Sequence, residues 1–181
     1  MTDIRCFVAV ELPESMREEI SRIEADLKVP GLRLVKPNLC HVTLKFLGEV
    51  PEKKIQKAME ALNGVRAAPF DLNVAGVGTF PGRSIRVVWL GLRGEMIDLH
   101  RQVEDTLEPL GFEREKRGFS PHVTLGRVGR PNSETTQELA PKIAGFSGVD
   151  LGTFRVDRFY LKKSTLTREG PIYENLAEYG L

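Results

Sequence analysis

The tetrapeptide HVTL occurs twice in this chain of 181 residues, at His41–Leu44 within NLCHVTLKFLGE and at His122–Leu125 within FSPHVTLGRVGR. The chain holds three histidines, so two of them stand in identical tetrapeptides that begin 122 − 41 = 81 positions apart. From average residue usage, two His-apolar-Thr-apolar matches in such a chain arise by chance in on the order of one sequence in a thousand. The repeat therefore predicts a duplicated strand that has a functional role as well as a role in packing.

Side chains alternate between the two faces of a strand, so His41 and Thr43 point one way while Val42 and Leu44 point the other. The second tetrapeptide repeats this division. One such tetrapeptide would more often be a solvent-facing strand than a site, and duplication can preserve a pattern without function. A core, however, needs only the valine and the leucine. The repeated His/Thr face favours an arrangement in which the polar faces of the two strands line opposite walls of one cleft.

The rest of the chain predicts an α+β fold. Apolar runs rich in β-branched and aromatic residues indicate strands at residues 4–12, 39–47, 70–80, 85–92, 121–128, 150–164 and 172–180. Helical periodicity indicates helices at residues 13–28, 51–64, 94–111 and 133–145, the last limited or bent by Pro141. The two halves match loosely, which predicts two α+β lobes packed around one groove. We expect residues 1–181 to form one two-lobed domain.

Composition narrows the class of protein. The formal net charge of +1 disfavours a protein that coats long nucleic acid by bulk electrostatics. Cys6 and Cys40 lie in apolar runs without CxxC or metal-ligand spacing, which indicates reduced core residues. The first residues, MTDIRCFVAVELPE, show no basic region followed by an apolar run, so we expect no targeting segment there. No apolar run is long enough to cross a bilayer. We expect a cytoplasmic monomer without membrane contact.

The surroundings of the histidines argue against metal and nucleophile chemistry. Catalytic zinc takes three protein ligands, yet no histidine or carboxylate follows His41 or His122 at i+2 or i+4, and Cys40 points away from His41. No GxSxG elbow is present. His100 lies on a predicted helix among charged residues, which indicates a solvated surface residue without a catalytic role. We expect neither metal nor cofactor.

Acid–base chemistry by the two histidines remains. Imidazole titrates near neutral pH, so one histidine can accept a proton while the other donates one. The threonine hydroxyls can donate hydrogen bonds to charged oxygens held between them. This arrangement suits in-line displacement at phosphorus, and a strained cyclic phosphodiester needs the least assistance.

The chain resembles the two-histidine (2H) phosphoesterase superfamily, and more narrowly the bacterial and archaeal RNA 2',3'-cyclic phosphodiesterases, also called 2'-5' RNA ligases. The resemblance covers essentially the whole chain through RCFVAVELPE, KPNLCHVTLKFLGEV, FSPHVTLGRV and FYLKKSTLTREGPIYENL. It implies a bilobal α+β fold with pseudo-two-fold duplicated lobes, each an antiparallel sheet with helices, around a central groove. It also implies hydrolysis of RNA 2',3'-cyclic phosphate ends, such as those of tRNA fragments, to 2'-phosphate ends without metal or nucleotide cofactor. With an RNA 5'-hydroxyl in place of water, the same attack would give reversible 2'-5' RNA ligation.

This resemblance implies catalytic roles for the residues of both motifs. His41 is expected to be the proton donor to the departing O3', and His122 the proton acceptor from water. Thr43 and Thr124 are expected to hold the non-bridging oxygens.

The family also uses the residue five positions after each histidine to hold the terminal nucleotide, here Phe46 and Arg127. Phe46 would stack on a base, and Arg127 would meet the phosphate or the base. Strict alternation places both on the Val/Leu face, so these roles require a bulge or a strand end. A core phenylalanine stays an alternative for Phe46, whereas a buried unpaired Arg127 would be costly.

Other basic residues are candidates for an RNA backbone track, although such charges are more often plain solvated surface. They are Arg114, Lys116, Arg117, Arg130, Lys162 and Lys163. Two functional alternatives stay open: a phosphodiesterase on another cyclic or 2'-5' nucleotide, and a non-catalytic module that binds RNA ends or nucleotides. Loss of one histidine would mark such a module, and this chain keeps both.

Overall fold

Nine strands and four α-helices make up the computed structural model of the chain, which describes residues 3–80 and 84–181. The strands are β1 (Asp3–Glu11), β2 (Leu32–Leu34), β3 (His41–Pro51), β4 (Phe70–Phe80), β5 (Val87–Gly94), β6 (His122–Val128), β7 (Asp150–Val156), β8 (Arg158–Thr167) and β9 (Gly170–Gly180). The helices are α1 (Arg17–Leu27), α2 (Glu52–Leu62), α3 (Ile97–Leu107) and α4 (Ser133–Gly145), with 3-10 turns at Glu14–Met16, Pro37–Leu39 and Glu108–Leu110. The predicted α+β class is confirmed.

The strands form one antiparallel sheet in the order β7-β4-β5-β6-β3-β1-β8-β9, where two separate sheets were expected. In the described parts of the chain, β3 and β6 pair at one position, Val42 with Val123. Further along, the same β6 pairs with the short strand β2, which the sequence did not predict. The sheet therefore has two halves that meet at the two HVTL strands.

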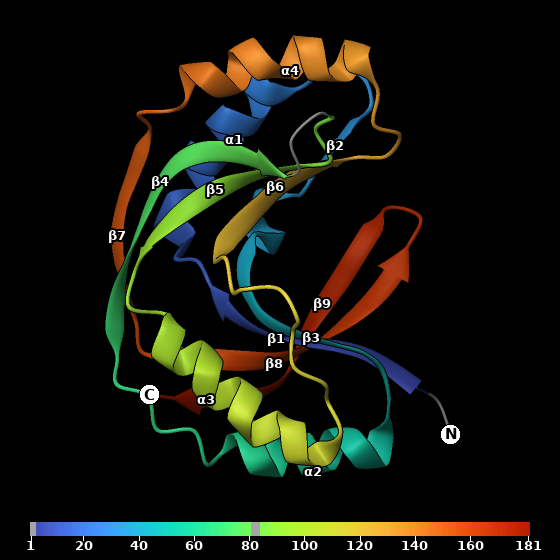
Figure 1. Cartoon of the computed structure of the whole chain (residues 1–181), viewed down its shortest axis with the longest axis vertical. Coiled ribbons are helices and arrows are strands. Elements are labelled where there is room, and N and C mark those ends of the chain that lie inside the picture. Colours follow the sequence, from blue (N-terminus) through green and yellow to red (C-terminus); the bar gives the residue numbers. More distant parts are fainter. Residues whose placement is uncertain (1–2, 81–83) are drawn as a thin grey trace.

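Each half of the sheet mixes early and late segments of the chain. The last strands, β8 and β9, extend the half that contains β1 and β3, while β4, β5 and β7 extend the half that contains β6. The single strand predicted at residues 150–164 is wrong, because the chain breaks at Asp157 into β7 and β8, which lie in different halves. The sheet curls enough for β7 and β8 to follow one another directly (Figure 1).

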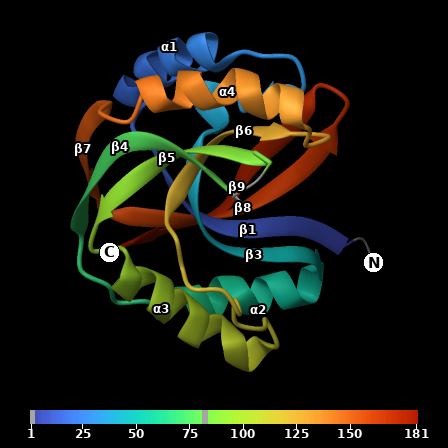
Figure 2. The same ribbon diagram turned by 45° about the horizontal axis from the view of Figure 1, so that its top comes forward.

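The helices form two pairs at opposite ends of the molecule. Helices α1 and α4 lie together at one end, and α2 and α3 at the other (Figures 1 and 2). Each buries an apolar stripe; in α2 it consists of Ile55, Ala58 and Leu62. Pro141 does not end α4, because the helix continues through it to Gly145. No helix in the described residues has the length and apolar character needed to span a membrane.

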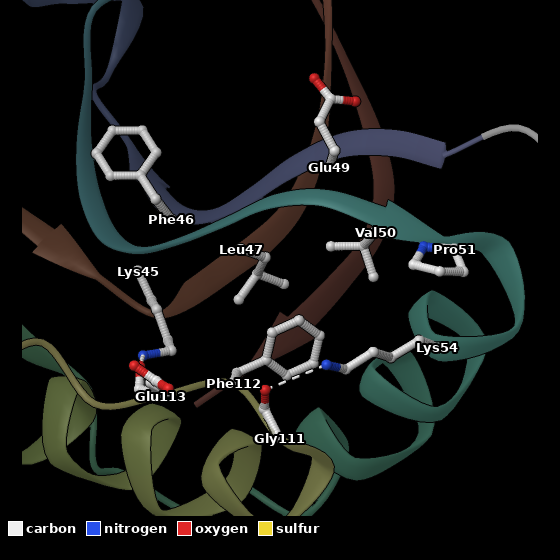
Figure 3. A pocket seen from close by; sticks show the side chains of 10 residues that line it. All are labelled: Lys45, Phe46, Leu47, Glu49, Val50, Pro51, Lys54, Gly111, Phe112 and Glu113. Carbon is white, nitrogen blue, oxygen red and sulfur yellow. Dashed lines mark hydrogen bonds between the residues drawn. The ribbon is translucent and has the colours of Figure 1, made fainter.

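An ion pair is buried behind β3, on the side of α2 and α3. The Lys45 ammonium donates to Glu104 Oε2 and to the Glu113 carbonyl, both at 2.7 Å, and both charged side chains are almost fully buried. Lys45 and Val50 point toward the helices, whereas Phe46 and Glu49 lie on the other side of the strand (Figure 3). The pair thus joins β3 to α3 and to the segment that leads toward β6.

The third histidine belongs to this buried cluster, so its interpretation as a solvated surface residue is wrong. The His100 ring stacks on Phe119 with centroids 3.8 Å apart, and its Nε2 lies 3.6 Å from Glu104 Oε1. Burial is the largest cause of a lowered pKa of His100. The two cysteines, in contrast, are buried and unpaired with each other, as predicted.

We expect Lys45→Met to lower the free energy of unfolding by about 3–5 kcal/mol, because it leaves the Glu104 carboxylate buried without its cation. Urea denaturation measures this change. Lys57→Met, at an exposed position of α2, is the matched control and should change stability by less than about 0.5 kcal/mol. Equal effects of the two substitutions would contradict the buried ion pair.

Candidate active site

The two histidines are the first residues of β3 and β6. Val42 and Val123 pair directly and are both fully buried, so the neighbouring His and Thr side chains point to the opposite face. In an antiparallel pair, this register sets His41 across from Thr124, because 42 + 123 = 41 + 124. It likewise sets Thr43 across from His122. The structure therefore brings the four polar residues of the two motifs to one face at the junction of the halves.

Both imidazoles are held by the same backbone device. Nδ1 of His41 lies 2.8 Å from the Leu39 carbonyl, and Nδ1 of His122 lies 2.8 Å from the Ser120 carbonyl, each two residues upstream. A carbonyl only accepts, so each Nδ1 carries a proton and each Nε2 is the atom that exchanges one. The Thr43 hydroxyl lies 3.0 Å from His41 Nε2 and donates to it when the ring is neutral.

A bulge follows the threonine in each strand. In the β1–β3 pairing Val8 faces Lys45 and Ala9 faces Thr43, so Leu44 is the extra residue. The β5–β6 pairing leaves out Leu125 in the same way. One extra residue reverses the faces downstream. The expected roles of Phe46 and Arg127 needed a bulge or a strand end, and the structure has a bulge in both motifs.

These bulges set the positions of Phe46 and Arg127. Phe46 is 61% exposed, which excludes the alternative of a core phenylalanine, and its ring lies 6.1 Å from that of Phe7. The Phe7 ring in turn lies 4.8 Å from His41. Arg127 is exposed as well, and its charge acts on His41. Both residues are therefore on the side of the sheet that carries the histidines.

Aromatic side chains that the sequence did not single out surround both histidines. Tyr173 on β9 meets His41 edge-on with centroids 5.4 Å apart, and Phe80 on β4 meets His122 edge-on at 5.0 Å. Trp89 on β5 packs against Phe80 at 5.2 Å and pairs with Thr124 in the sheet. These residues lie far from the motifs in sequence, so only the strand pairing could have identified them.

A polar pocket of about 280 Å³ opens beside His41. Lys162 in this pocket is buried and donates to Glu11 Oε1 at 2.5 Å and to Asn175 Oδ1 at 2.7 Å. Lys162 therefore lies within the site. The sequence had suggested it as a candidate for an RNA backbone track on the surface. Arg114 is committed elsewhere, to Asp105 and Glu108.

The pKa of His41 lies below its ordinary value. Burial is the largest cause, and the positive charges of Lys162 and Arg127 act in the same direction. The Leu39 carbonyl and the Glu11 carboxylate oppose this shift but do not cancel it. His41 is therefore neutral in the unliganded protein at neutral pH.

The arrangement resembles known proteins over nearly the whole chain. Residues 10–89 and 91–173 match the model of the family described as LigT like phosphoesterase. The RNA 2',3'-cyclic phosphodiesterase of Archaeoglobus fulgidus is 42% identical over 177 residues, covering 96% of this chain and 98% of the relative. That of Methanocaldococcus jannaschii is 35% identical over 178 residues, covering 97% of this chain and all of the relative.

Solved structures share the fold. TT0787 of Thermus thermophilus superposes with a TM-score of 0.83 at 27% identity, covering 98% of both chains. Escherichia coli LigT complexed with 3'-AMP superposes with a TM-score of 0.80 at 28% identity, covering 99% of this chain and 98% of its own.

We expect ¹⁵N NMR to find the Nδ1–H tautomer in the neutral forms of His41 and His122, because each Nδ1 faces a carbonyl. In a titration from about pH 8 to about pH 5, the His41 ring should gain its proton at lower pH than histidine in the urea-unfolded chain. The sign follows from the lowered pKa, since the neutral form persists further into the acid range. An Nε2–H tautomer, or a His41 midpoint at or above the unfolded value, would refute this geometry.

Proposed function

The chain belongs to the LigT like phosphoesterase family, and we propose that it hydrolyses RNA 2',3'-cyclic phosphate ends to 2'-phosphate ends. The relatives from Archaeoglobus and Methanocaldococcus bear the name of that activity, and E. coli LigT has been crystallised with 3'-AMP, a nucleotide. The observation that carries the proposal is the pairing of Val42 with Val123, which sets two His/Thr pairs on one face in antiparallel register.

The proposed step is an in-line displacement at phosphorus. Water attacks the cyclic phosphate while His122 accepts its proton through Nε2. The bond between phosphorus and O3' breaks, and His41 donates a proton from Nε2 to O3'. Thr43 and Thr124 donate hydrogen bonds to the non-bridging oxygens, whose charge grows in the transition state. The products are a 2'-phosphate and a 3'-hydroxyl, with the proton moved from His41 to His122 and returned through solvent.

This assignment requires that His41 be protonated when the substrate is bound. The lowered pKa of His41 in the free protein opposes that state. Binding of the anionic cyclic phosphate would raise the pKa of His41 again, because a negative charge beside an imidazole favours its protonated form. The substrate thus brings about the ionisation that its own cleavage needs.

Phe46 and Arg127 are the proposed contacts to the terminal nucleotide. The exposed Phe46 ring offers a face for a base to stack on, and Arg127 offers a planar set of donors for the phosphate or the base. With an RNA 5'-hydroxyl in place of water, the same site would form a 2'-5' linkage reversibly. We propose that hydrolysis prevails in water and that the protein acts as a monomer, without metal or cofactor, on RNA ends such as those of tRNA fragments.

In excess EDTA, ³¹P NMR should show a short RNA with a 2',3'-cyclic phosphate converted to the 2'-phosphate. His41→Ala and His122→Ala should each lower kcat on the order of 10²–10⁴-fold, because each removes a proton-transfer group. His100→Gln, the third histidine in the packed cluster behind β3, is the matched control and should keep most of the rate. An inactive wild-type protein that still binds RNA ends would favour a binding module, and turnover of other cyclic or 2'-5' nucleotides alone would favour a different substrate.

A substrate with sulfur in place of O3' separates the two histidine roles. A thiol has a pKa near 8.5, so the sulfur can leave without receiving a proton. On this substrate we expect His41→Ala to recover most of its lost rate and His122→Ala to stay slow. The reverse pattern would exchange the acid and the base between the two residues.

A further inference from the structure

The pocket beside His41 extends away from the proposed base-stacking residue. It is lined by residues before His41 on the chain, Asn38 and Leu39, whereas Phe46 follows His41 on the same strand. The mechanism above uses His41 but nothing else in this pocket. Its remaining polar wall comes from β1, α1, β8 and β9, through Glu11, Arg17, Lys162 and Asn175.

Lys162 is a buried, hydrogen-bonded residue of this pocket. Its side chain is 9% exposed, although an ammonium group in the interior is costly to desolvate. Glu11 and Asn175 accept two of its three N–H groups. The Asn175 amide also donates to Glu11 Oε1 at 3.3 Å, which fixes the carboxylate. An ammonium has three donors, and the Tyr160 ring, with its centroid 5.4 Å from Nζ, takes none of them as a hydrogen bond. Among residues 3–80 and 84–181, two acceptors contact Nζ, so its third donor is available to a ligand.

The charges near the pocket favour an anion. Lys162 and Arg17 line it together with one carboxylate, that of Glu11, whose Oε1 is already shared by Lys162 and Asn175. Glu14 contacts Arg17 at 3.3 Å, but this pair is exposed and therefore weak. Arg127 adds a further positive charge that reaches His41. Lys162 and Arg17 together with the Glu11 carboxylate leave a net charge of +1 on the pocket lining, which suits a phosphate group.

We propose that this pocket binds the phosphate on the 5' side of the terminal nucleotide, with Lys162 and Arg17 as its donors. The proposal rests on the proposed function, in which His41 meets O3' of the terminal ribose. With the base on the Phe46 side, the 5' carbon of that ribose and its phosphate extend toward the opposite side, where the pocket lies. In an RNA substrate this is the internucleotide phosphate, so the pocket selects RNA ends over cyclic mononucleosides.

Adenosine 2',3'-cyclic phosphate, with and without a 5'-phosphate, tests the subsite. We expect the wild-type protein to hydrolyse the 5'-phosphorylated compound with a kcat/KM about tenfold higher, as one charged hydrogen bond would give. Lys162→Met should bring the ratio of the two kcat/KM values close to one. The ratio is the informative quantity, because any change that the substitution causes at His41 affects both substrates equally.

Lys163→Met is the matched control, because Lys163 is the next residue of β8, points to the other face and pairs with Glu174 at 3.0 Å. It should keep the wild-type ratio. If Lys162→Met does not fold, Glu11→Gln/Lys162→Met removes the pair together, and Arg17→Gln tests the second donor at a partly exposed position. An unchanged ratio in the Lys162 and Arg17 variants, or a wild-type ratio of one, would overturn the subsite while leaving the proposed function standing. Hydrolysis of neither compound nor of cyclic-ended RNA would overturn the proposed function itself.

Discussion

The pairing of Val42 with Val123 is the constraint on which the site depends. Both valines are fully buried, so a shift of either strand by one residue would turn a histidine into the core. The core thereby selects the register, and the register sets each histidine across from the other motif's threonine. The chemistry of the open face is thus held in place by hydrophobic packing on the other face.

Both strands then use a bulge after the threonine, but the structure supports the two bulges differently. Behind β3, Lys45 and Glu104 form a buried ion pair that occupies the inner position next to the bulge. Behind β6, the equivalent position is Gly126, where an added Cβ would lie 2.9 Å from Leu32 of β2. The inner position is a charged residue in β3 and a glycine in β6, yet the outcome is the same in both strands. Phe46 and Arg127 lie on the face of the histidines.

The identical tetrapeptides do not give the histidines identical surroundings. Glu11 pairs with His41 in the sheet, whereas Gly91 pairs with His122 at the corresponding place. Glu11 brings Lys162 and Asn175 with it, and the pocket forms beside His41. The two histidines of the identical motifs thus have different environments. Separate acid and base roles would require such a difference.

The sequence by itself determined most of the strands, the four helices, the α+β class, both cysteines in the core and the shared face of the four motif residues, because these follow from local periodicity and from the repeat. It missed the short strand β2, which has no such pattern. The roles that the family resemblance gives to Phe46 and Arg127 added the expectation of a bulge or a strand end, since an offset of five conflicts with alternation. Only the tertiary structure decided that residues 150–164 split at Asp157, that His100 is packed on Phe119, and that Glu11, Lys162 and Tyr173 surround His41. Those outcomes depend on which strands pair across long stretches of chain, and strand pairing leaves no local pattern in the sequence.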